Sequence, residues 1–176
     1  MKRQQRDPKP SPRGKPLPTR YKLEDERPGF TRKVVVYTER YDADGRIEYD
    51  EKGYPRIYEV EVYFTVGEYD DGTPGEVYII MGKEGEETGG WANSWATSIS
   101  FLLQYGIDPR HIIQKFKGVD FVPCGMTNCP QVPICKSIPD LIVRYIEWKY
   151  FSQHEDNEDG YASVLDAAVG ESDKKE

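Results

Sequence analysis

Residues 59–81, EVEVYFTVGEYDDGTPGEVYIIM, decide the fold class of this chain. Val60, Val62, Phe64 and Val66 alternate with more polar residues, which is the period-two pattern of a strand with one solvent-facing side. The turn-forming residues YDDGTPGE follow, and a second β-prone run occupies residues 77–81. The stretch therefore predicts two antiparallel strands joined by a turn.

A third strand is expected upstream, where residues 34–37 read VVVY. Between this run and residue 59, the dipeptides Asp44–Gly45 and Lys52–Gly53 are turn signals. They predict that residues 41–55 form an extended hairpin loop.

Downstream of the strands the apolar period becomes helical. One helix is expected from about residue 90 to 105, with Gly106 as a left-handed cap. The side chains expected to face inward from this helix are Trp91, Trp95, Ile99, Leu102 and Leu103.

Two further helices have recognisable starts. Asp108 and Pro109 suit the cap and first turn of a short helix that ends at Gly118, and Ser137 with Asp140 suits the start of a third. The predicted fold class is α+β: an antiparallel β-meander of three or more strands, followed by three helices packed on one face.

Charge divides the chain into three parts. Residues 1–30 hold nine Lys/Arg against four Asp/Glu together with six prolines, and residues 152–176 hold two Lys against eight Asp/Glu. Such blocks bury too little apolar surface to offset the entropy of ordering them. We expect a disordered basic, Pro-rich arm at 1–30, one domain at 31–151 and a disordered acidic tail at 152–176.

The composition also indicates where in the cell the protein is expected. No run approaches the roughly 18 apolar residues of a membrane span, and no apolar run follows the charged N-terminus. The three cysteines are too few for a disulfide scaffold. The expected location is the cytoplasm, with no membrane partner; the oligomeric state is left open.

Three stretches resemble a known domain. They are residues 64–85 (FTVGEYDDGTPGEVYIIMGKEG), residues 98–109 (SISFLLQYGIDP) and residues 115–148, which end in CKSIPDLIVRYIEW. Together they resemble the TSCPD domain, named for its Thr-Ser-Cys-Pro-Asp signature. Lys136, Ser137, Ile138, Pro139 and Asp140 stand at the signature. Lys136 and Ile138 replace its Thr and Cys, and the nearest cysteine, Cys135, lies three positions from the place of the signature cysteine.

The resemblance implies an association with ribonucleotide reduction, since the domain occurs at the C-terminal end of cobalamin-dependent, class II ribonucleotide reductases and as a separate small chain. It implies a class II reductase catalytic subunit as partner, with adenosylcobalamin in that partner and no cofactor on this chain. The catalytic barrel does not fit into 120 folded residues. The first hypothesis is therefore a non-catalytic accessory module linked to deoxynucleotide supply for DNA synthesis.

Two alternative functions remain open. Gly82, Lys83, Gly85, Gly89, Gly90 and Trp91 lie between a strand and a helix start, where backbone N–H groups can hold the phosphate of a nucleotide. Acidic neighbours in the same loop oppose this, and a plain turn explains it as well. A free-standing nucleotide-binding protein is the second hypothesis.

The third hypothesis is a thiol shuttle built from Cys124, Cys129 and Cys135. Cys124 and Cys129 could meet across a turn, although packed loop residues are the simpler reading. A zinc site would need His111 or His154 as a fourth ligand and lacks the paired C-x2-C spacing, so no metal is expected.

Three remaining features have competing readings. Ser137 and Asp140 suit capping better than catalysis, because no histidine is near them in sequence. Trp91 and Trp95 suit core anchoring better than base stacking. The basic arm could bind phosphate backbones, an acidic partner or the acidic tail, and nucleic acid is not the expected ligand because the rest of the chain is acidic.

Overall fold

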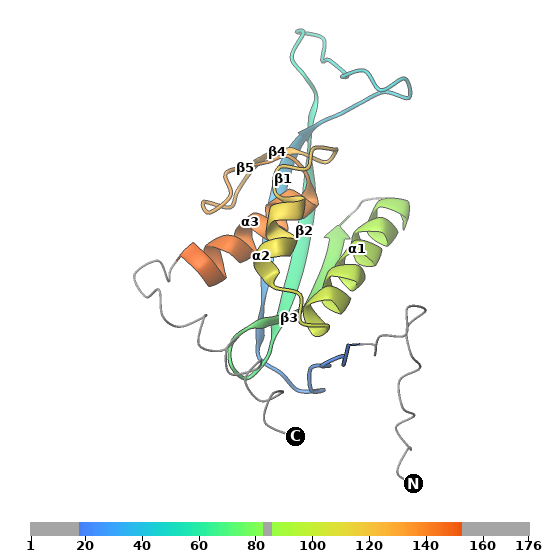
Figure 1. The fold of residues 1–176 in the computed structure, drawn as a ribbon. Coiled ribbons are helices and arrows are strands. Elements are labelled where there is room, and N and C mark those ends of the chain that lie inside the picture. Colours follow the sequence, from blue (N-terminus) through green and yellow to red (C-terminus); the bar gives the residue numbers. More distant parts are fainter. Residues whose placement is uncertain (1–17, 83–85, 153–176) are drawn as a thin grey trace, which may run out of the picture. The chain divides into compact units, whose positions relative to one another are not determined.

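A computed structural model describes residues 18–82 and 86–152 (Figure 1). Along the chain it contains β1 (Gly29–Glu39), β2 (Ile57–Glu68), β3 (Pro74–Gly82), α1 (Glu86–Gln104), α2 (Pro109–Phe116), β4 (Gly125–Thr127), β5 (Ile134–Cys135), α3 (Ile138–Glu147) and a π-helical turn, η1 (Trp148–Ser152). The strands form one five-stranded sheet in the order β3-β2-β1-β4-β5. The α+β prediction is confirmed.

The chain divides into two compact units. The first contains the residues up to Lys33 and Tyr63–His111, and the second contains Val34–Val62 and the residues from Ile112 onward. The strands β1 and β2 pass from one unit to the other. Each unit is described by itself below.

In the first unit, α1 packs along β3. The inward side chains of β2 and β3 are buried, as the alternation in residues 59–81 predicted: Phe64, Val66, Val77 and Ile79 are at most 3% exposed. Burial of this apolar surface stabilises the unit by roughly 25 cal/mol per Å².

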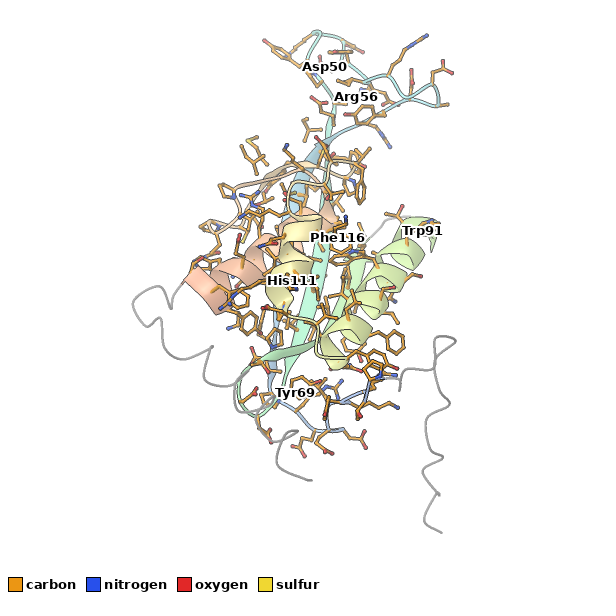
Figure 2. The ribbon with its side chains drawn as sticks, in the orientation of Figure 1. Asp50, Arg56, Tyr69, Trp91, His111 and Phe116 are labelled. Carbon is orange, nitrogen blue, oxygen red and sulfur yellow. The ribbon has the colours of Figure 1, made fainter. Side chains whose placement is uncertain are left out.

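The inward face of α1 differs from the prediction. Ala96, Ile99 and Leu103 are buried, whereas Trp91 is 79% exposed and Leu102 is 40% exposed. Figure 2 shows Trp91 at the start of α1. The helix turns its small residues, Ala96 and Ser100, toward β3, which allows a close approach, and this rotates Trp91 and Leu102 toward solvent. The core-anchoring prediction is therefore wrong for Trp91.

The ends of the helices follow the caps expected from the sequence. Gly106, at φ +77°, closes α1, and the N–H groups of Gly106 and Ile107 donate to Leu103 O and Leu102 O. Asp108 Oδ1 accepts from the Arg110 N–H at the start of α2. The start of α1 lies four residues before the expected one, at Glu86.

In the second unit, α3 supplies more of the core than any other element. Leu141, Ile142 and Val143 are at most 1% exposed, and α3 contacts β5. The strands β4 and β5 form a short antiparallel hairpin, in which Met126 pairs with Ile134 and Gly125 with Cys135. The sequence analysis did not predict these strands, because segments of three and two residues carry no readable alternation.

The connection between β1 and β2 is an extension made of two similar turns (Figure 2, Asp50 and Arg56). Asp42 Oδ1 accepts from the N–H groups of Asp44 and Arg46, and Asp50 Oδ1 accepts in the same way from Lys52 and Tyr54. The predicted extended hairpin loop is confirmed, and its turns centre on the two expected Gly residues.

Within the part of the chain that the structure describes, no helix combines the length and the apolar character that crossing a bilayer requires.

Candidate functional site

The signature segment forms the start of α3. Ser137 is the N-cap residue: its hydroxyl donates to Val119 O at 2.7 Å and accepts from the Asp140 N–H at 3.2 Å. Ser137 therefore caps the helix and also binds the connection between α2 and β4. The predicted capping role of Ser137 is confirmed.

Asp140 connects more of the second unit than a capping residue does. Its side chain is 1% exposed, and Oδ1 accepts from the Gly118 N–H at 2.7 Å while Oδ2 accepts from the Lys136 N–H at 2.9 Å. The Arg144 guanidinium lies 3.4 Å from Oδ2 and also donates to Ile134 O at 2.6 Å. We call Ser137 and Asp140 the signature latch, because together they join the α2–β4 connection and the end of β5 to α3.

The signature latch stabilises structure. Both Asp140 oxygens already accept hydrogen bonds from backbone N–H groups. The other signature residues agree with this reading: Ile138 is buried, Pro139 lies in the first turn of α3 and Lys136 is exposed.

The three cysteines lie around the β4–β5 hairpin. Cys135 in β5 pairs with Gly125, the neighbour of Cys124, while Cys129 is buried in the turn between the strands and its thiol contacts Gln131 at 3.4 Å. None of the three forms a disulfide. The strand pairing brings Cys135 next to Cys124, where the sequence analysis had instead considered a meeting of Cys124 and Cys129.

The environment of two of these thiols disfavours the thiolate. Burial raises the pKa of Cys135 to about 11, and the negative charge of Asp140 adds to this. Burial also raises the pKa of Cys124, assisted by Asp120 and Glu39. Since the thiolate is the nucleophile in thiol exchange, both groups react less readily than an ordinary cysteine. The thiol shuttle stays a prediction.

The residues expected to hold a nucleotide are only partly described. Lys83 and Gly85 lie outside the described residues. Gly82 ends β3, whereas Gly89, Gly90 and Trp91 occupy the first turns of α1. Nothing lies within 4 Å of a Cβ built on Gly89 or Gly90, so neither glycine is required by a close contact. Nucleotide binding here stays a prediction.

A polar cluster that the sequence analysis did not identify lies in the first unit. Gln104, 4% exposed, donates to Gly75 O and accepts from Arg20 Nε at 2.8 Å, while Gln104 O accepts from the Tyr21 N–H. The Arg20 guanidinium lies 4.1 Å from the Phe101 ring centroid. These contacts attach residues 20 and 21 to α1 and β3.

A second attachment involves Arg27. Its guanidinium forms an ion pair with Glu76, which is 6% exposed, and donates to Glu24 O. The hydrogen bond to Glu76 raises the pKa of Arg27. The sequence offered one signal for this ion pair, the acidic residue Glu76 within the apolar run of β3. Its partner Arg27 belongs to residues 1–30, which were expected to form the basic arm. The boundaries of that arm stay a prediction.

Within the two described stretches, 18–82 and 86–152, no group of three His, Cys, Asp or Glu side chains converges in a way that would hold a metal ion.

Comparison with known proteins assigns a family. The model of the TSCPD domain matches residues 32–150. The vitamin B12-dependent ribonucleotide reductase of Rhodopirellula baltica is 39% identical over 95 residues, which cover 54% of this chain and 9% of that protein. The reductases of the same name from Streptantibioticus cattleyicolor and Bradyrhizobium diazoefficiens are 32% and 30% identical, over 74% and 77% of this chain and 22% and 9% of their own length.

The chain thus spans a tenth to about a fifth of these relatives. No solved structure gives a significant match. The family match covers both the strands of the first unit and the signature latch of the second. This chain belongs to the TSCPD domain family.

Proposed function

We propose that this chain is an accessory module of a vitamin B12-dependent, class II ribonucleotide reductase, and that it acts by binding the catalytic part of that enzyme. The observation that carries the proposal is the match of residues 32–150 to the TSCPD domain, together with the similarity of 95 residues to a stretch that makes up 9% of the Rhodopirellula baltica reductase. A domain that forms part of an enzyme in relatives has a natural partner in the rest of that enzyme.

The hydrogen bonds of two polar side chains and the pKa values of two cysteines support a non-catalytic role. Ser137 and Asp140 are engaged in the signature latch, and the pKa values of Cys124 and Cys135 are raised. In the proposed complex the radical chemistry and the redox thiols belong to the partner, and this chain contributes contacts.

The pocket of the first unit does not fit adenosylcobalamin. The pocket beside β1, β2 and β3 has a volume of about 480 Å³ and is lined by three carboxylates. Pockets of roughly 300–1,000 Å³ enclose drug-sized ligands, and a corrinoid with its nucleotide loop is far larger. The proposal therefore assigns the cofactor to the partner.

Calorimetry tests the proposal. The titration uses the Rhodopirellula baltica reductase lacking the 95-residue region similar to this chain, with the intact reductase as the matched control. We expect saturable one-to-one binding to the deleted enzyme and at least tenfold weaker binding to the intact enzyme, whose own domain already occupies the site. Equal binding to both, or binding to neither, would overturn the proposal.

A further inference from the structure

A pocket in the first unit lies where the segment before β1 meets β1, β2 and β3. Its volume is about 480 Å³. The residues that carry the argument are Asp25, Glu26, Arg27, Gly67, Glu76 and Tyr78. All of them come from one compact unit, so the pocket is a feature of that unit alone.

Glu76 is a polar residue of the pocket lining whose position is fixed by its neighbours. Its carboxylate is paired with Arg27 and accepts a hydrogen bond from the Tyr78 hydroxyl at 3.1 Å. Gly67 makes room for it, because a Cβ on Gly67 would lie 2.5 Å from Glu76 Oε1. Glu76 is thus held in place by two side chains, in a position that a side chain on residue 67 would obstruct.

The charge of the lining is negative. Asp25, Glu26 and Glu76 contribute three carboxylates against the single guanidinium of Arg27, which is already paired with Glu76. The Asp25 and Glu26 side chains are exposed at the rim. A concave surface lined by one sign of charge attracts groups of the opposite sign.

Apolar side chains continue the surface along β3. Tyr78 is 49% exposed and Ile80 is 69% exposed, although both lie in a strand whose alternate residues Val77 and Ile79 are buried. Exposed apolar surface next to a polar rim is typical of a protein–protein contact. We call the surface formed by Asp25, Glu26, Glu76, Tyr78 and Ile80 the acidic face.

The outer edge of β3 is occupied at Gly75 and Val77. Ser100 Oγ accepts from the Val77 N–H at 2.9 Å and lies 3.1 Å from Val77 O and 2.8 Å from Ala96 O, while Gln104 donates to Gly75 O. These side chains of α1 occupy backbone groups that an incoming strand would use at these two residues. This favours a partner that binds the side chains of the sheet face.

We propose that the acidic face binds a basic, apolar segment of the reductase's catalytic part, with a Lys or Arg side chain of the partner between Asp25, Glu26 and Glu76 and an apolar side chain against Tyr78 and Ile80. This inference rests on the proposed function. The negative charge of the acidic face favours a basic partner segment. Because α1 side chains occupy the edge of β3 at Gly75 and Val77, we expect this segment to contact side chains of the sheet face and not to add a strand.

The test compares four full-length variants by binding to the same deleted reductase. Two change the acidic face: the double variant Asp25→Lys with Glu26→Lys, and Ile80→Asp. Two are matched controls in the second unit: Glu51→Lys on the exposed extension, and Met126→Asp, where the native side chain is 65% exposed. Circular dichroism and urea unfolding confirm that all four fold as the wild type does.

We expect both acidic-face variants to weaken binding at least tenfold and both controls to stay within twofold of the wild type. Wild-type binding should also weaken as salt rises from 50 to 300 mM, and the double variant should lose most of that salt dependence. Unchanged binding by the acidic-face variants overturns this inference while leaving the proposed function intact. Tighter binding also overturns it, and would point to the chain's own basic residues 1–17 as a competing occupant of the acidic face. Absence of wild-type binding counts against the proposed function itself.

Discussion

At the scale of the residue, Asp140 shows how one buried carboxylate joins several segments of the second unit. Its two oxygens accept from Gly118 and Lys136, which lie on opposite sides of the β4–β5 hairpin in sequence. A buried donor that loses its acceptor costs about 1–3 kcal/mol, so the energy of the latch is concentrated in a single side chain.

We therefore predict that Asp140→Ala lowers the free energy of unfolding by about 2–4 kcal/mol, since two backbone N–H groups lose their acceptors. Urea denaturation at pH 7 measures the change. The exposed Asp44→Ala on the extension is the control and should change stability by less than about 0.5 kcal/mol, because its ion pair with Arg46 is solvent-exposed. A loss below 0.5 kcal/mol for Asp140→Ala would show that the latch is dispensable.

The cysteines give a second prediction at this scale. A thiol with a pKa of about 11 is ionised to roughly one part in a thousand at pH 8, so Cys135 should resist alkylation in the folded protein. Cys124, half-buried, should react first and more slowly than a free thiol. Mass spectrometry after iodoacetamide treatment, with and without urea, measures this order. Rapid native labelling of Cys135 would contradict the assigned environment.

The raised pKa of Cys135 also makes the free energy of unfolding depend on pH. Because the folded pKa of Cys135 lies above the unfolded value near 9, the unfolded state ionises first as pH rises. The contribution of Cys135 to stability is therefore fully present below pH 9 and is lost as the pH approaches 11.

At the scale of the element, the features that could be predicted from the sequence were those determined by residues close together in the chain. The alternation of β2 and the caps at Gly106, Asp108 and Ser137 depend on neighbouring residues, and the structure confirms them. The rotation of α1 could not be read in this way, because it depends on which small residues approach β3. The ion pair between Arg27 and Glu76 was equally hidden, since 49 residues separate its partners.

Ser100 allows a test of how α1 protects β3. Ser100→Ala removes the hydroxyl that accepts from the Val77 N–H, and we expect a loss of about 1–2 kcal/mol in unfolding free energy. The exposed edge should also promote self-association, seen by light scattering coupled to gel filtration. Ser98→Ala is the matched control, because that hydroxyl donates only within its own helix. Equal stability and equal self-association of the two variants would refute the role of Ser100 in covering the edge of β3.

At the scale of the whole molecule, the chain is a TSCPD domain in which buried polar groups join its segments. The family and its link to ribonucleotide reductases could be predicted from the sequence, because the signature segment and the Gly-rich turn before β3 are local patterns. The acidic face could not, because its residues come from the segment before β1 and from β3 and meet only in the folded unit.

The most direct test of the central claim is an activity assay in trans. The Rhodopirellula baltica reductase lacking its similar region is mixed with wild-type chain or with a cysteine-free variant, Cys124→Ser, Cys129→Ala and Cys135→Ala. Thioredoxin serves as the reductant, because a small dithiol would bypass any protein thiol shuttle. We predict that both chains restore deoxynucleotide formation equally, since the proposed role is to bind the catalytic part of the enzyme and not to exchange thiols. Restoration by the wild type but not by a folded cysteine-free chain would contradict the account and assign the thiols a chemical role.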